Sequence, residues 1–464
     1  MPWQSGNAMK STRSLRAAAA VFAAALAVAG RAAASDGVVT LAAAVQQALR
    51  EAPDARIARL EAEQADDAAA AARSLYWPHA ALSSKAGWSN RQDDTINAID
   101  GQGELKRYPL STLGSSEPWL GVYIDQVLFD LKSWRDVQRT ELEAEAASVA
   151  EAQQREGISA AVLDQYLEVV RLESLVERDR QRLRDAEWLD RQAQLLRDAG
   201  RALPSEQEQA ALEVEQARLD ADEHAAQLTH ARDVLAQLIG AEGGAGADLQ
   251  VDRASLPAVP AGEPADGQGE LGGAPELRIL ALRQRMEELS LDAARAGRYP
   301  TLAVRGGYFH YGTKRFSAFE QEVAVGFDLK VPVFDGFQTS ASIDRATKAA
   351  EAAKLRYETV REQKTARARE LARRVGAAAQ QDALAERRAR IASERQRLAD
   401  ASLQGQRGSV GQALTARSEA VRAAGEALDA QLAAVRAWAA LQRERGELSL
   451  ALAGESAGAA EDAR

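Results

Sequence analysis

A short sequence pattern occurs twice in this chain, and a segment of the same length follows each copy. The first copy reads Val127-Leu128-Phe129-Asp130 and the second reads Val331-Pro332-Val333-Phe334-Asp335. The distance from Phe129 to Gly200 is 71 residues (200 − 129), and that from Phe334 to Gly405 is also 71 residues (405 − 334). The pattern predicts a duplicated unit with two helical arms of equal length, whose tips lie in one plane. Such a constraint on length favours a conduit or a scaffold over an enzyme.

The N-terminus has the residue order of a secretory signal peptide. Lys10, Arg13 and Arg16 precede the apolar run Ala17 to Ala29, and Ala32-Ala33-Ala34 offers a small-residue cleavage site. We expect residues 1–34 to be removed on export, with Met9 as an alternative start; a cytosolic Ala-rich helix is the competing interpretation. Their removal takes away four positive charges and no acids, so the formal charge goes from −10 to −14. A chain this acidic is a poor ligand for nucleic acid.

Composition narrows the class of protein further. No other segment approaches the ~18 continuous apolar residues of a spanning helix, which leaves a soluble protein or a β-barrel. Cysteine is absent, so disulfides, thiolate metal sites and a lipid-anchored cysteine are excluded. We expect His224 and His230, six residues apart on different helix faces, to be solvated. No phosphate loop, metal-ligand cluster or Ser/His/Asp motif occurs, so we predict neither an enzyme nor a cofactor.

Long helices are expected over four segments, which are 134–199, 201–239, 338–404 and 409–452. They lack internal proline apart from Pro204, which falls in a first turn where proline is tolerated. Apolar residues recur at helical spacing, as at Val162, Tyr166 and Val169. A helix of 66 to 70 residues is about 100 Å long. A chain of this form cannot bury its apolar stripes alone, so self-association is expected.

A β-like region precedes each long arm. Trp77-Pro78 and Tyr299-Pro300 end the preceding helices, because proline disfavours helix in the residue before it. Apolar residues then alternate with small or polar ones, as in Val323, Val325, Phe327 and Leu329 against Asp328 and Lys330, and in Leu120, Val122 and Ile124 against Asp125. This alternation is typical of a barrel strand with lipid outside and water inside. An amphipathic sheet packed on a soluble core is the alternative.

Each β-like region supplies two strands, 79–89 with 117–128 and 301–312 with 321–331. Their lengths fit a tilted membrane strand of ~9–11 residues. Four strands do not close a barrel, since the smallest bacterial barrels have about eight, whereas three chains supply twelve. The separation from Trp77 to Tyr299 in the sequence is greater than that from Phe129 to Phe334. The first hairpin therefore holds the extra residues in its polar stretch 90–116, which we expect outside the cell.

We divide the chain into two repeats and three shorter segments. After the signal peptide, the first repeat covers 35–240 and contains a long hairpin at 130–239. A Gly/Pro-rich stretch at 241–275 reads as a linker or irregular structure. The second repeat covers 276–454 and contains a long hairpin at 336–452, and the polar tail 455–464 is expected to be disordered.

This organisation resembles the TolC-type outer membrane factors, the trimeric channel-tunnels of Gram-negative bacteria. The duplicated strand units, the aromatic-proline pairs, Pro275-Glu276-Leu277 and the turns at Gly200 and Gly405 carry the resemblance, which covers Thr40 to Leu452. It implies an α+β membrane protein, with a trimeric 12-stranded outer-membrane β-barrel continued by a 12-helix periplasmic tunnel. The strand-to-helix transitions then fall at Phe129, Asp130, Pro332, Phe334 and Asp335.

The resemblance further implies that the two glycine turns lie at the periplasmic entrance. Family members commonly place acidic residues shortly after the second turn, where this chain has Gln412 and Thr415. The first half instead offers Glu206 and Glu208. In a trimer one acidic position makes a ring of three carboxylates, which is a plausible selectivity filter. The alternative is that both acids are favoured in a first turn by the helix dipole.

Two arginines are candidates for closing this entrance. Arg201 and Arg407 each lie close to a glycine turn. Ion pairs from them to neighbouring helices would contribute ~1 kcal/mol or less each, which suits a gate that must open.

The function implied is passive export across the envelope, with a periplasmic adaptor and an inner-membrane ABC or proton-driven transporter as partners. Many drug-efflux members carry an N-terminal lipidated cysteine, so its absence favours export of a protein or toxin by type I secretion. Small-molecule efflux is the alternative. A soluble periplasmic coiled-coil scaffold or adaptor is the second alternative, although no biotinyl-lipoyl-like segment is evident. Outer-membrane lipid is an expected partner and nucleic acid is not.

Overall fold

The computed structural model describes residues 38–85, 95–99, 105–109, 119–198, 203–241, 249–260, 273–312, 319–404 and 410–453. The predicted signal peptide 1–34, the predicted turns at Gly200 and Gly405 and the predicted tail 455–464 lie outside these ranges. The chain forms two compact units. Unit 1 is built from residues up to Arg59, Glu151–Glu276 and from Arg361 onward, and unit 2 from Leu60–Ala150 and Leu277–Val360.

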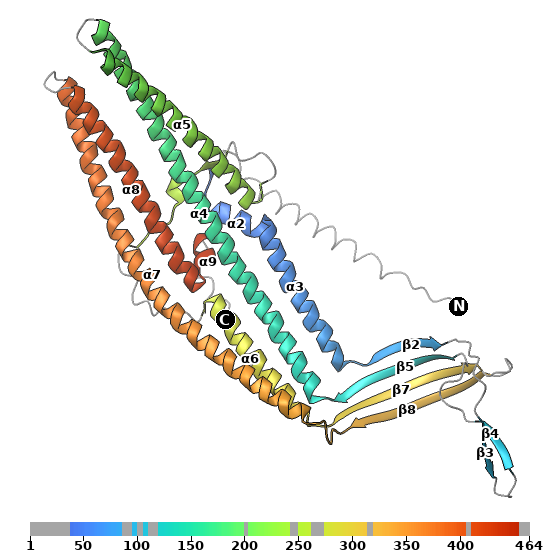
Figure 1. Ribbon diagram of the computed structural model, residues 1–464. Helices are drawn as coiled ribbons and strands as arrows, with labels where there is room; N and C mark the ends of the chain where they lie inside the picture. Colours follow the sequence, from blue (N-terminus) through green and yellow to red (C-terminus); the bar gives the residue numbers. More distant parts are fainter. Residues whose placement is uncertain are drawn as a thin grey trace, which may run out of the picture. The chain divides into compact units, whose positions relative to one another are not determined.

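Unit 2 contains a four-stranded antiparallel sheet in the order β2-β5-β7-β8 (Figure 1). The strands are β2 (His79–Lys85), β5 (Trp119–Phe129), β7 (Thr301–Gly312) and β8 (Phe319–Lys330). The four predicted strands are therefore confirmed, with β7 matching 301–312 and β8 beginning two residues before the predicted 321–331. The stretch 90–116 holds two short strands that the sequence did not predict. β3 (Thr95–Ile99) and β4 (Leu105–Pro109) pair with each other in a separate antiparallel sheet.

The two faces of the large sheet differ in polarity as the alternation predicted. Val122 on β5 lies opposite Tyr308 on β7, and Tyr308 lies opposite Val323 on β8. One face of the sheet is therefore a band of exposed apolar side chains. On the other face Asp125 pairs with Arg305. A ring lies flat on this polar face, because a Cβ added at Gly121 or at Gly307 would come within 2.4 Å or 2.5 Å of Phe309. The two glycines thus make room for an aromatic side chain on a surface that is otherwise polar.

The order of elements is repeated along the chain. The first series is α3 (Pro53–Arg73), β2, β5, α4 (Leu131–Asp198) and α5 (Pro204–Leu238). The second series is α6 (Pro275–Ala296), β7, β8, α7 (Gln338–Gln404) and α8 (Val410–Arg445). The long helices α4 and α7 have 68 and 67 residues, which confirms the equal arms. No described helix combines the length and the apolar character that a membrane span requires.

The apolar core lies in unit 1, where the middle of α4 packs with α2 (Leu41–Glu51), α5 and α8. Tyr166 on α4 is fully buried there, and its hydroxyl accepts a hydrogen bond from Asp252 N at 2.8 Å. The same oxygen lies 2.9 Å from Val39 O and 3.0 Å from Ser255 Oγ. Burial raises the pKa of Tyr166, so the hydroxyl keeps its proton. It joins the parallel pair β1 (Val38–Val39) and β6 (Gln250–Val251) to α4, so part of the predicted linker 241–275 is ordered structure.

The helix predicted over 409–452 is broken, which is a correction. α8 ends at Arg445, Gly446 has φ 77°, and a separate helix α9 spans Leu448–Ala453. Glu447 N bonds to Gln442 O at 3.0 Å, which is the hydrogen bond that closes a helix at a left-handed glycine. A Cβ at Gly446 would lie 2.4 Å from Pro275 Cδ, so glycine is required here for its conformation and for its size. Because the flanking residues are good helix formers, periodicity alone did not reveal the break.

Candidate functional site

The first strand-to-helix transition is built from Phe129 and Asp130. Asp130 Oδ1 accepts a hydrogen bond from Ser133 N at 3.2 Å, and its Oδ2 accepts one from Ser133 Oγ at 2.6 Å. The carboxylate therefore caps the N-terminus of α4, where backbone N–H groups have no helical partner. Phe129 contacts Trp134 edge-on, with ring centroids 5.4 Å apart. These residues set the direction in which the long helix leaves the sheet.

The second transition repeats this arrangement with different details. Asp335 Oδ2 accepts a hydrogen bond from Thr339 N at 2.8 Å, and hydrogen bonding to Thr339 lowers the pKa of Asp335. Phe334 and Phe337 make an edge-on contact at 5.7 Å. Phe337 has φ 70°, a left-handed conformation that is rare for a residue with a side chain. Pro332, Phe334 and Asp335 are all exposed in the single chain.

The polar face of the sheet holds an ion-paired arginine. Arg305 Nε lies 2.9 Å from Asp125 Oδ1, and Arg305 Nη1 lies 3.5 Å from Asp328 Oδ2. The three residues come from β5, β7 and β8, so the pairs link three strands. A shallow hollow of about 600 Å³ next to them is lined by His79, Tyr123 and Phe309 among others. This charged face is the one that the alternation in the sequence predicts to face water.

Some of the predicted entrance residues can be placed. Glu208 is exposed on α5, and Gln412 and Thr415 are exposed on α8. Glu206 lies in the first turn of α5. Gly200, Arg201, Gly405 and Arg407 lie outside the described residues. The entrance ring and the arginine lock therefore stay predictions.

Arginines that were not predicted as functional residues join the two helices of each hairpin by ion pairs. Arg182 on α4 bonds to Glu213 at 2.8 Å and to Asp220 at 2.7 Å on α5. Arg197 Nη1 donates to Gln207 Oε1 at 2.6 Å. In the second hairpin, Arg417 on α8 bonds to Asp400 on α7 at 3.0 Å. Single charges on a charged helix carry no signal of their partners, so only the packing of the helices reveals these pairs.

A groove of about 560 Å³ separates α4 from α8 near these pairs, and Thr415 lies on its wall. The groove is also lined by Arg178, Asp179 and Arg422. Asp179 is buried, and its Oδ2 lies 2.6 Å from His224 Nδ1 on α5. The prediction that His224 is solvated is therefore wrong, because its helix face packs on α4; His230 is exposed as predicted.

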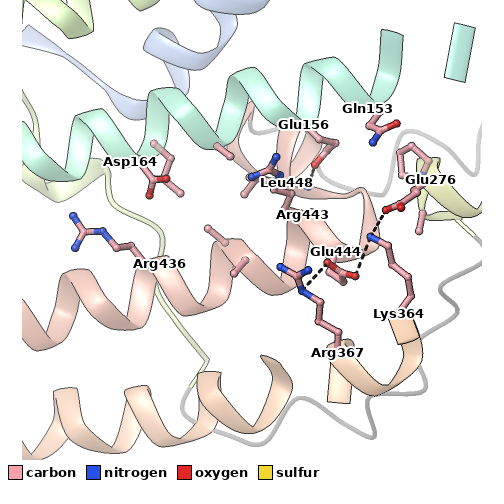
Figure 2. Close-up of a pocket in the computed structure, with 16 residues that line it drawn as sticks. Gln153, Glu156, Asp164, Glu276, Lys364, Arg367, Arg436, Arg443, Glu444 and Leu448 are labelled. Atoms are coloured by element: carbon pink, nitrogen blue, oxygen red, sulfur yellow. Dashed lines mark hydrogen bonds and ion pairs between the residues drawn. The ribbon is translucent and has the colours of Figure 1, made fainter. Parts of the chain in front are cut away.

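A partly buried cluster of charges lies where α6 begins, α7 passes and α8 ends. Figure 2 shows Lys364 between Glu276 at 2.7 Å and Glu444 at 3.0 Å, with Arg367 at 3.5 Å from the second carboxylate. The side chain of Glu444 is 8% exposed and that of Lys364 is 18% exposed. Burial alone lowers the pKa of Lys364, but hydrogen bonds to Glu276 and Glu444 outweigh it, and the net direction is upward. The lysine therefore stays charged and is shared between the two carboxylates, and Arg367 supplies a second positive charge to Glu444.

The charge cluster lines a cavity of about 460 Å³. A second buried carboxylate, that of Glu156, lies on the wall of this cavity (Figure 2). Glu156 on α4 accepts hydrogen bonds from Leu448 N at 2.8 Å and from Ser449 N at 3.1 Å, and a third from the Ser449 hydroxyl. It therefore caps α9 from another helix and fastens the C-terminal segment to α4. Neither Glu156 nor Lys364 was predicted, because helices far apart in sequence bring their partners to them.

The interactions described so far fasten helices and strands to one another. Within the described ranges, no group of three His, Asp or Glu side chains is placed to hold a metal ion. Several charged residues are instead paired between helices, such as Arg182 with Glu213 and Lys364 with Glu444.

The comparisons with known proteins agree with this fold. Residues 268–447 match the family described as outer membrane efflux protein. The structure of the outer membrane protein VceC from Vibrio cholerae is similar, with a TM-score of 0.68 at 16% identity over 88% of this chain and 96% of that one. The CmeC outer membrane channel of Campylobacter jejuni has a TM-score of 0.69 at 14% identity, covering 88% and 86%. The open state of the MtrE outer membrane channel of Neisseria gonorrhoeae has a TM-score of 0.63 at 19% identity, covering 88% and 89%. No curated protein matches the chain in sequence.

These likenesses confirm the predicted fold class, a trimeric channel-tunnel with four strands from each chain and a long helical tunnel. They also confirm the outer membrane as the location, with a large periplasmic part, and a channel rather than an enzyme. Residues 268–447 thus match the outer membrane efflux protein family, and the chain as a whole has the fold of outer membrane channels.

Proposed function

We propose that this channel is the outer-membrane part of a small-molecule efflux pump. The main support for this proposal is the match of residues 268–447 to a family described as outer membrane efflux protein. The channel works as a homotrimer with a periplasmic adaptor and an inner-membrane transporter, which supplies the energy. The polar sheet face and the long helices support this role, because a barrel with a polar inner face encloses an aqueous passage.

Export of a protein or toxin by type I secretion is the second candidate, which the absence of cysteine from the sequence favours. A strain lacking the gene separates the two. For efflux, we expect sensitivity to several unrelated small toxicants to rise several-fold, with an unchanged set of secreted proteins, and the restored gene to reverse the change. Loss of one secreted protein with unchanged sensitivity would make type I secretion the function instead.

We also propose that acids after the first glycine turn form the entrance selectivity ring. Glu208→Gln and Glu206→Gln are each expected to reduce the preference of the purified trimer for cations, since each removes three carboxylates around the axis. The measurement is the reversal potential across a lipid bilayer in a salt gradient. Gln412→Glu should have the opposite effect.

Asp233→Asn is the matched control, since it removes the same charge from an exposed position near the other end of α5. If both glutamate variants behave like this control, the two acids serve the helix dipole and the ring is elsewhere.

The division into two repeats, 35–240 and 276–454 with a linker between them, is our proposal for the origin of the chain by duplication. Its support is the repeated order of helix, two strands, long helix and return helix.

A further inference from the structure

The groove between α4 and α8 begins where the apolar core of unit 1 ends. Val176 on α4 and Leu428 on α8 are 4% and 2% exposed and belong to that core. Further toward the end of α4 and toward the start of α8, the same two helices line the groove of about 560 Å³, which we call the hairpin groove. The two helices belong to different helical hairpins (Figure 1). The apolar core thus gives way to a groove between the two hairpins of one chain.

The walls of the hairpin groove are partly apolar. Ala186 and Leu189 on α4 and Val421 on α8 contribute to them. Ala186 is buried, and Leu189 is 38% exposed. Small molecules bind to proteins in clefts of ~300–1,000 Å³ that combine apolar walls with a few polar groups. The hairpin groove therefore has the size and the apolar lining of a small-molecule site.

One arginine of the groove lacks a partner. Among the residues that the structure describes, Arg178 makes no hydrogen bond and no ion pair, and its Nε is buried. Burial of part of a charged group without a partner is unfavourable, because the group loses its contacts with water and gains none in exchange. Arginine cannot give up its proton to relieve that cost. The arrangement calls for an acceptor that the described residues do not supply.

The helix α8 makes room for this guanidinium. A Cβ added at Gly425 would lie 2.0 Å from Arg178 Nη1 and 2.9 Å from Arg178 Cζ. The guanidinium therefore lies against the backbone of α8, in the space that a glycine leaves. Glycine is unfavourable in the interior of a helix, and the approach of Arg178 gives a reason for it here. The two helices together place the charge at the end of the groove nearest the core.

The other charges of the groove are already paired. The three acids on its walls have partner atoms at 2.6 to 3.1 Å, which are those of His224 for Asp179, Arg182 for Glu213 and Gln181 for Asp185. The exposed Arg422 lies 3.9 Å from Glu426. The charge of the groove that has no partner among the described residues is therefore positive, and an anion is the ligand that complements it.

We propose that the hairpin groove binds a small organic anion, with a carboxylate on Arg178 and an apolar body against Leu189 and Val421. A guanidinium bonds best to a planar anion with two oxygens, through two parallel hydrogen bonds. The apolar walls favour an aromatic or branched carbon skeleton over a short acid, because more apolar surface leaves water. The ligand contacts helices of both hairpins and therefore joins them, whichever class of cargo the channel exports.

Binding of 2-naphthoate to the full chain, purified into lipid nanodiscs, tests this proposal. The comparison compounds are 2-naphthamide, which has nearly the same shape without the charge, and acetate, which has the charge without the apolar body. We expect naphthoate to bind saturably and both comparison compounds to bind roughly tenfold more weakly or less, since each lacks one kind of contact. Equilibrium dialysis, with empty nanodiscs as the blank, gives the bound fraction.

A variant of the arginine tests the position of the site. Arg178→Met should weaken naphthoate binding roughly tenfold or more, because it removes the charge-assisted hydrogen bonds. Arg191→Met is the matched control, which removes an exposed arginine of the same helix that does not line the groove. Ser418→Trp should also abolish binding, because it places a ring in the groove from an exposed position of the wall and keeps Arg178.

Three results would each overturn the proposal. The first is naphthoate binding of equal strength in Arg178→Met and in Arg191→Met. The second is equal binding of naphthoate and of the uncharged naphthamide to the unaltered chain. The third is the absence of saturable naphthoate binding to the unaltered chain.

The unfolding temperature separates a ligand site from a structural role of the same arginine. Without ligand, Arg178→Met should raise the unfolding temperature, because it removes a charge without a partner among the described residues. Naphthoate should raise the unfolding temperature of the unaltered chain but not that of Arg178→Met, since a ligand stabilises only a folded state that binds it. A lower unfolding temperature of the variant, with no effect of naphthoate on either protein, would mean that Arg178 supports the packing of α4 on α8 and binds no ligand.

Discussion

Replacing Lys364 with methionine is expected to lower the free energy of unfolding of unit 1 by roughly 3–5 kcal/mol, which is the usual cost of removing one partner from a buried ion pair. The reason is the position of Glu444, whose side chain is 8% exposed and lies 3.0 Å from the lysine. Without Lys364 its nearest cation is Arg367 at 3.5 Å, which is itself largely exposed. The measurement is the urea midpoint of the purified protein, followed by helical circular dichroism.

Two further variants make this prediction specific. Lys354→Met removes an exposed lysine from the same helix and is expected to have little effect. Lys364→Met combined with Glu444→Met should recover most of the loss, because an apolar pair leaves no buried charge. A double variant as unstable as the single one would mean that packing, rather than charge, holds this region.

The same cluster predicts a pH dependence. The pKa of Lys364 is raised above its ordinary value of 10.5, so the folded state holds the proton more tightly than the unfolded state. Its stabilising contribution is therefore complete below pH 10.5 and is lost as the pH rises through the higher folded-state pKa. Lys364→Met should flatten the fall in stability in this alkaline range.

Replacing Glu156 with alanine is expected to cost about 3 kcal/mol, because it leaves buried donors without an acceptor. These donors are Leu448 N, Ser449 N and the Ser449 hydroxyl, which the carboxylate now satisfies. Glu156→Gln keeps one acceptor oxygen and should cost less. Glu145→Ala, an exposed position on the same helix, is the matched control.

Hydrogen exchange locates the effect of the alanine variant. Amides of α9 should exchange faster, since α9 is held by this cap and by packing on α2 and α8. If α9 keeps its protection while the whole unit loses stability, then Glu156 acts through the core and not as a cap.

Local regularity explains which parts of the fold were predictable. The strands around Val323 and Val122 follow from a period of two, and α4 and α7 follow from long proline-free segments with helical spacing. Breaks that depend on a single contact were missed. Gly446 ends α8 where Pro275 approaches it, and nothing adjacent in the sequence marks that approach.

The site residues also fall into those that the sequence could predict and those that it could not. Asp130 and Asp335 could be selected from sequence, because each follows a strand and caps the next helix within a few residues. Lys364, Glu156 and the Asp179–His224 pair could not. On helices this rich in charge, a residue that is paired and buried looks the same as one that is solvated.

The duplication, the equal length of the two arms, the four strands and the polarity of their faces could all be predicted, since these depend on spacing within a segment. Which charges are buried together, where the C-terminal helix breaks and which helix faces remain uncovered became visible only in the folded chain. Those outcomes depend on how helices distant in sequence pack. The physical reason is that periodicity reports which side of an element is apolar but not which neighbour will cover it.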